Sequence, residues 1–190
     1  MKNNTFQSNS IWNDAARSGI VLGLVSVAYM VCSNLLAKIN ASGVGAAALN
    51  VGSLILWGFK FYLCIHLMKV FMQRYADTHE DVTNGDTFRF GALTALLSAL
   101  IYSGLALAWS LFVQPEALGD AMQTVLAASS DALNETQISA VEELIPKLPS
   151  ITFFLNFSWC WLFGTVLSAI LSANIPSKNP FKNMSGPDDQ

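Results

Sequence analysis

Four long apolar stretches limit what this chain can fold into. A helix needs about 20 mostly apolar residues to cross the hydrocarbon core of a bilayer. Residues 18–37, 90–113 and 151–175 reach this length with no Asp, Glu, Lys, Arg or His inside them. A fourth stretch, residues 44–66, contains Lys60 and ends at His66. The pattern predicts an all-α membrane protein with four transmembrane helices in an antiparallel bundle, built as one integral membrane domain over residues 1–190.

Lys60 does not prevent the second stretch from inserting. The strongly apolar residues around it contribute about -3 to -6 kcal/mol to insertion, against about +2.5 to +3.5 kcal/mol for one central lysine. The long side chain also reaches toward the membrane surface, which lowers its cost further.

Composition excludes several classes of protein. Charged residues make up 12% of the chain, compared with about 25% in soluble domains. A net charge of -3 provides no basic field for nucleic acid. The three cysteines lie far apart in apolar runs, which excludes a disulfide framework or a zinc cluster. No nucleotide-binding loop, serine-hydrolase motif or zinc-protease motif is present, so we expect no enzyme, no cofactor, no metal and no catalytic residue.

The lysines and arginines near the ends of these stretches predict the orientation. Seven lie on the side that holds both termini and two on the other, so both termini are expected in the cytoplasm. The first group is Lys2, Arg17, Lys69, Arg74, Arg89, Lys178 and Lys182, and the second is Lys38 and Lys147. The first stretch is longer than a signal-peptide core and no cleavage site follows it, so a retained anchor is favoured over a cleaved leader.

The connections differ in character. The extracytoplasmic connection, residues 114–150, shows two sets of apolar residues at helical spacing and six acidic residues, which predicts a short helical hairpin. This hairpin either caps the bundle or docks a partner. The cytoplasmic loop begins as a helical continuation, Met68 to Tyr75, and then contains Asn84-Gly85, a turn signal, with Asp86 or Thr87 placed to cap the third helix. Residues 176–190 form a polar cytoplasmic tail.

An acidic stretch in the same loop leaves two interpretations open. It contains Asp77, His79, Glu80, Asp81 and Asp86. Their spacing matches no known calcium loop, so a solvated acidic turn is favoured over a metal site.

A polar face on the second helix is the candidate site. At 100° per residue, Asn50, Ser53 and Lys60 fall, with Trp57 and Cys64, within an arc of about 80°. Such a face is costly against lipid and should look inward or at water. It either contacts a substrate or lipid headgroup, or only bonds to neighbouring helices. The candidate neighbours are Ser26, Tyr29, Ser33, Asn34, Ser98, Tyr102 and Asn156.

Small residues repeat along each predicted helix, and small residues let helices approach closely in lipid. They pack the bundle internally or serve a homo-oligomer or another membrane protein. The pairs and runs are Gly19 and Gly23; Ala48 and Gly52; Gly91, Ala95, Ala99 and Ser103; and Gly164, Ser168 and Ser172.

Several short motifs together resemble one family. They are Gly58-Phe-Lys60-Phe-Tyr62, Asn84-Gly85-Asp86-Thr87-Phe88, Gly91 at the start of the third helix, and Pro115-Glu116 before the last. The chain is similar over about residues 16–175 to the bacterial membrane proteins grouped as domain of unknown function 4199. The resemblance implies a four-helix inner-membrane protein. It implies no activity and no catalytic residues.

These observations favour a non-enzymatic accessory or assembly subunit, whose partners are the lipid bilayer and either a second copy or another membrane protein. The alternative is a small-molecule permease or channel that uses Asn50, Ser53 and Lys60. No carboxylate lies within a predicted membrane-crossing stretch, which argues against an ion-coupled carrier.

Overall fold

The computed structural model describes residues 3–39, 44–79, 82–129 and 134–176, and all regular structure in these ranges is helical. The elements are α1 (Asn3–Ala37), α2 (Val44–Thr78), α3 (Asn84–Phe112), α4 (Ala117–Ser129), α5 (Glu135–Leu144), the 3-10 turn η1 (Ile145–Lys147) and α6 (Leu148–Asn174). Four helices, α1, α2, α3 and α6, are long and apolar enough to cross a membrane. The predicted class and the predicted number of spans are therefore confirmed.

The helices continue beyond the apolar stretches. α1 and α2 are each 35 residues long, whereas the sequence predicted crossing stretches of 18–37 and 44–66. No proline or glycine interrupts residues 3–17, so nothing stops the helix before the lipid begins. The predicted helical continuation from Met68 to Tyr75 is confirmed.

The cap of α3 differs from the prediction. Thr83 is the N-cap residue, and its hydroxyl accepts a hydrogen bond from the Asp86 backbone N–H at 3.2 Å. The Asp86 carboxylate accepts in return from the Thr83 N–H, also at 3.2 Å. Asp86 is thus the third residue of a capping box, and Asn84-Gly85 opens the helix instead of forming a turn before it. The prediction for Asp86 is thus confirmed in part: its carboxylate lies in the first turn and takes part in the cap, but the N-cap residue is Thr83 and not Asp86 or Thr87.

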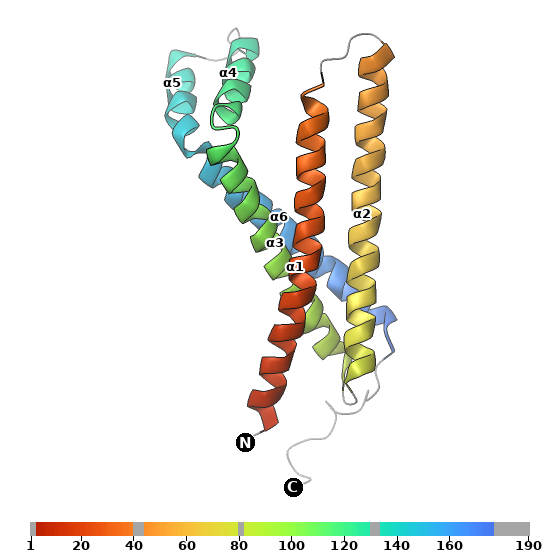
Figure 1. Ribbon diagram of the computed structural model, residues 1–190. Coiled ribbons are helices and arrows are strands. Elements are labelled where there is room, and N and C mark those ends of the chain that lie inside the picture. The colour runs from red at the N-terminus through yellow and green to blue at the C-terminus, as the bar shows by residue number, and fades with distance from the viewer. Residues whose placement is uncertain (1–2, 40–43, 80–81, 130–133, 177–190) are drawn as a thin grey trace.

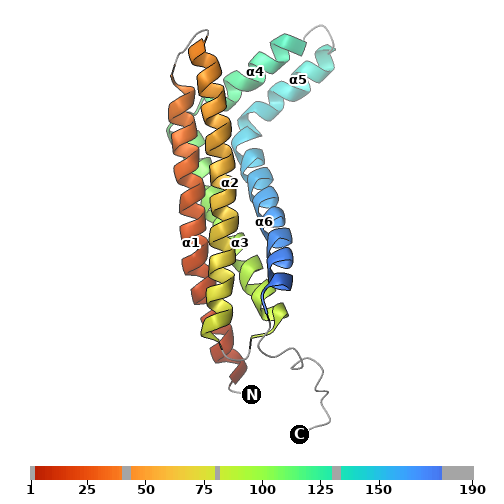
Figure 2. The ribbon, with the colours of Figure 1, turned by 90° about the vertical axis from the view of Figure 1, so that its right-hand side faces the viewer.

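α3 is the central helix of the bundle. It packs along α6 and along α1, whereas α2 leans mainly on α1 and makes fewer contacts with α3 and α6. The start of α1 and the end of α6 lie at one end of the molecule, which we call the terminal end (Figure 1). α4 and α5 lie at the opposite, hairpin end (Figures 1 and 2), and in the view of Figure 1 α3 and α6 lean away from α1 and α2 toward that end.

The predicted helical hairpin between the third and fourth spans is present as α4 and α5. It packs on η1 and the start of α6. It lies beyond the ends of α3 and α6 and leaves those of α1 and α2 uncovered (Figure 1). Pro149 in the first turn of α6 and the short links on both sides hold it there. The hairpin is therefore not a cap over the whole bundle.

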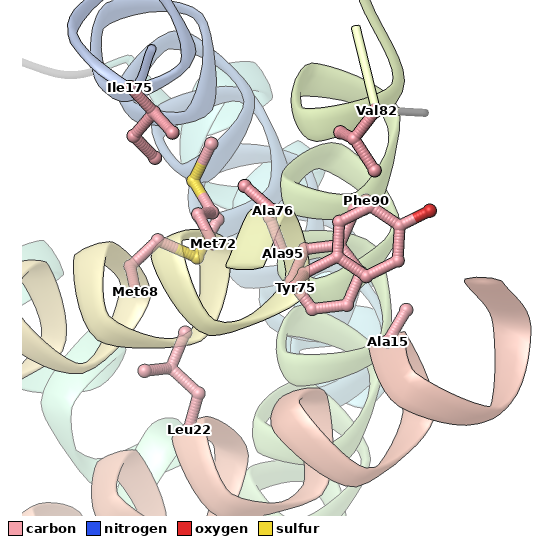
Figure 3. Close-up of a cluster of buried hydrophobic side chains, with 10 residues drawn as sticks. All are labelled: Ala15, Leu22, Met68, Met72, Tyr75, Ala76, Val82, Phe90, Ala95 and Ile175. Atoms are coloured by element: carbon pink, nitrogen blue, oxygen red, sulfur yellow. The ribbon is translucent and has the colours of Figure 1, made fainter. Parts of the chain in front are cut away.

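The buried core lies near the terminal end. Met68, Met72 and Tyr75 of α2 meet Phe90 of α3 and Ala15 of α1 (Figure 3). The rings of Tyr75 and Phe90 stack with their centroids 4.4 Å apart. Many large apolar side chains elsewhere on the long helices are exposed, as expected where lipid covers the protein surface.

Small residues allow close contacts between three of the four long helices, α1, α3 and α6. A Cβ added at Gly164 of α6 would lie 2.5 Å from Ala95 Cβ, and one added at Gly91 of α3 would lie 2.7 Å from Ser168 Oγ. On α1, a Cβ at Gly19 would lie 2.8 Å from Leu97 Cβ. These close approaches make internal packing the use of the stripes on α1, α3 and α6.

Candidate functional site

Lys60 lies where α1, α2 and α3 face one another. Its Nζ is 5.1 Å from the centre of the Tyr29 ring and 5.4 Å from that of Tyr102. Both distances allow a cation–π contact, in which the negative face of each ring attracts the ammonium. Two of the predicted neighbours of the polar face, Tyr29 and Tyr102, thus hold the lysine between α1 and α3.

A cleft of about 270 Å³ lies beside Lys60, between all four long helices. Its polar groups include Lys60 and Cys64 of α2, Ser26 of α1 and Ser98 of α3. The Cys64 sulfur is 4.0 Å from the Ser26 hydroxyl, at the limit of a weak hydrogen bond. Most of the remaining lining is apolar or aromatic. The cleft therefore suits the apolar part of a molecule better than a hydrated solute.

Asn50 and Ser53 do not share this cleft. Both are exposed, and neither lines the space beside Lys60. The candidate face is divided: Trp57, Lys60 and Cys64 line the cleft, and its first two residues lie exposed nearer the hairpin end. The spacing alone did not reveal this division, because it depends on α3 and α6 spreading away from α2.

The start of α2 is exposed on nearly all sides. A Cβ added at Gly52 would meet no atom within 4 Å, in contrast to the glycines of α1 and α6. Val51, Leu54 and Ile55 have exposed fractions of 58%, 68% and 67%. The small-residue pair Ala48 and Gly52 thus has no packing partner among the described residues, so this helix face is open to another molecule.

A second, smaller cleft lies at the hairpin end. It measures about 180 Å³ and is lined by Ser103 and Ser110 of α3, Gln114, and Asn156 of α6. The Trp109 indole N–H donates to the Gln114 side-chain oxygen at 3.4 Å. The Ser103 hydroxyl is fully buried and has no hydrogen-bond partner in the described part of the chain. Sequence reasoning placed Asn156 beside Lys60, whereas the structure places it in this separate cleft.

A third cleft, of about 380 Å³, lies at the terminal end between α1, α2 and α3. Its charged residues are Asp14 and Arg17 of α1 and Arg74 of α2, and His79 also lines it. Sequence reasoning counted these arginines only as signs of orientation. The sequence did contain a signal for this cleft: Arg17 precedes the first apolar stretch and Arg74 follows the second, so both lie on the same predicted side of the membrane.

The described residues contain no group of three His, Cys, Asp or Glu side chains placed to hold a metal ion. Glu80 and Asp81, part of the acidic stretch, lie outside the described residues. His79 Nδ1 is 3.0 Å from the Tyr75 carbonyl oxygen, and its ring packs on that of Tyr75 with centroids 4.5 Å apart. The histidine of this stretch is thus held against α2.

Comparison with known proteins gives the family. Neither a curated protein nor a solved structure is significantly similar to the chain. One family model, described as "Protein of unknown function (DUF4199)", matches residues 17–175. This range contains α2, α3, α6 and the part of α1 from Arg17 onward, and it ends next to the last residue of α6. The resemblance carried by the short motifs is therefore confirmed, and the chain is a multi-pass membrane protein that belongs to the DUF4199 family.

Proposed function

We propose that the protein is a non-enzymatic accessory or assembly subunit of a bacterial inner membrane, with both termini in the cytoplasm. The seven-to-two distribution of lysine and arginine supports this orientation. In it, the terminal end of the bundle faces the cytoplasm and the α4–α5 hairpin faces the other side.

The observation that carries the proposal is the exposed first half of α2. Asn50 and Ser53 place an amide and a hydroxyl on a helix surface that the rest of the bundle does not cover. Polar side chains within a membrane normally face other protein or water, because lipid offers them no hydrogen bonds. Gly52 adds a position where a second helix backbone can approach closely. A helix of another membrane protein would cover all three residues.

Site-specific photo-crosslinking in living cells tests this contact. A photoreactive amino acid at Ser53 is compared with one at Leu24, which is 52% exposed on α1. We expect a crosslink to one identified membrane protein from position 53 and only lipid adducts from position 24. A crosslinked species of twice the chain's mass would show that this surface binds a second copy of the chain, which would favour self-assembly over the accessory role. Lipid adducts alone at both positions would contradict the proposal.

A pair of glycine substitutions tests the same surface. Gly52→Leu should reduce the crosslink from position 53 by about ten-fold, because the added side chain separates the helix backbones. Gly104→Leu on α3 is the matched control, since a Cβ added there also meets no atom within 4 Å. Equal crosslinking in the two variants would show that the small-residue pair is not the contact.

The cleft beside Lys60 favours a second candidate, a permease or channel for small molecules. It lies between the four long helices and contains the one ionisable Lys or Arg of the predicted crossing stretches. In this case Lys60→Met should abolish solute flux into proteoliposomes. Unchanged flux in the variant would remove the candidate's main support.

A further inference from the structure

The cleft at the terminal end has the size and the charges of a binding site. Its volume of about 380 Å³ falls within the range of small-molecule pockets, about 300–1,000 Å³. Arg17 of α1 and Arg74 of α2 both line it, although 57 residues separate them in sequence. The fold therefore brings two guanidinium groups from different helices to one cavity.

Within the part of the chain that the structure describes, neither arginine forms a salt bridge with a carboxylate. Among the described residues, the single salt bridge joins Lys147 to Glu143 at 3.2 Å, at the hairpin end. Among the described residues that line the cleft, Asp14 is the one carboxylate, against two arginines. The described lining therefore carries two positive charges and one negative charge.

The walls of the cleft are partly apolar. The stacked rings of Tyr75 and Phe90 form one wall (Figure 3), and Phe71 and Val21 line the side toward the centre of the bundle. Arg17 directly precedes the first apolar stretch, 18–37, so the cleft lies at the level where a membrane surface meets the hydrocarbon. The cleft thus combines charged side chains with apolar ones. This combination matches a molecule that has an anionic group at one end and an apolar part at the other.

We propose that this cleft binds a phosphate group, with Arg17 and Arg74 donating charge-assisted hydrogen bonds to its oxygens. Guanidinium groups suit this ligand because their planar N–H donors match the geometry of phosphate oxygens. Basic pockets between transmembrane helices bind the headgroups of anionic lipids in this way. The phosphate belongs either to such a headgroup or to a phosphorylated solute.

Native mass spectrometry of the detergent-purified full chain tests the proposal. The protein is titrated with dioleoylphosphatidylglycerol and, separately, with dioleoylphosphatidylcholine, which has the same acyl chains but no net charge. We expect tighter binding of the anionic lipid. The double variant Arg17→Gln/Arg74→Gln should weaken that binding by about ten-fold or more, because it removes both charged hydrogen-bond donors.

Two further variants separate specific binding from general charge. Arg89→Gln removes an arginine that is exposed near the same end of the bundle but does not line the cleft, and it should bind the lipid as the unmodified protein does. Asp14→Asn removes the opposing carboxylate and should bind more tightly. Because this variant gains affinity, misfolding cannot produce the expected result.

Titration with inorganic phosphate distinguishes the two sources. If phosphate stabilises the protein against heat and the double arginine variant loses this effect, the cleft serves a phosphorylated solute. If phosphate has no effect but the lipid binds, the ligand is the headgroup. Equal lipid binding by the double variant, Arg89→Gln and the unmodified protein, without a phosphate effect, would overturn the proposal.

Discussion

At the scale of single residues, two buried threonines of α3 form a natural comparison. Thr87 is 2% exposed, and its hydroxyl donates to the Thr83 carbonyl at 3.2 Å. Thr94 is fully buried, and its hydroxyl has no hydrogen-bond partner among the described residues. Burying an unpaired hydroxyl costs about 1–3 kcal/mol, whereas a formed hydrogen bond contributes about 1 kcal/mol to stability.

We therefore expect Thr94→Val to raise the free energy of unfolding by about 1 kcal/mol and Thr87→Val to lower it by about as much. Valine has nearly the same shape, so packing changes little in either variant. Thermal unfolding in detergent, followed by circular dichroism, measures both. A larger loss of stability from Thr94→Val than from Thr87→Val would show that Thr94 has a hydrogen-bond partner.

At the scale of helices, the contact between α3 and α6 depends on glycine. Gly164 faces Ala95 so closely that an added Cβ would lie 2.5 Å from the Ala95 Cβ. Gly164→Ala should therefore push the helices apart and lower stability by about 1–3 kcal/mol. Gly104→Ala is the control, because its Cβ meets no atom within 4 Å. Thermal unfolding of the two variants in the same detergent compares them, and equal midpoints would contradict the expected clash.

The helices themselves were predictable from the sequence, but their ends were not. Apolar length reports how much of a helix lipid can cover, so it found four spans. It did not find that α1 begins at Asn3, because the residues before the lipid are polar but contain no helix breaker. The N-cap residue Thr83 was also not predicted, because a capping box is recognised only when both partners of the pair are considered.

The division of the candidate face could not be predicted either. Periodicity places Asn50 and Lys60 on one side of a helix, but it says nothing about which neighbours cover each part. In the structure, Tyr29 and Tyr102 hold Lys60, while Asn50 is exposed. The terminal cleft shows the same limit: no local pattern connects Arg17 with Arg74, and only the pairing of α1 with α2 brings them together.

At the scale of the whole molecule, the testable property is orientation. Single cysteines at Asn4, near the start of α1, and at Thr136 in α5 should react from opposite sides of the membrane with a reagent that cannot cross it. Each single cysteine is introduced into a chain in which Cys32, Cys64 and Cys160 are replaced by alanine, and that cysteine-free chain is the control. Labelling of both positions from the same side of sealed vesicles would contradict an arrangement with four crossings.

The spreading of α3 and α6 away from α1 and α2 has a consequence for the surrounding lipid. In the view of Figure 1, the protein is narrow at its terminal end, where the core lies, and wider toward the hairpin. Such a wedge displaces more area in one leaflet than in the other. A bilayer around many copies would relieve this imbalance by bending, with its convex side toward the hairpins.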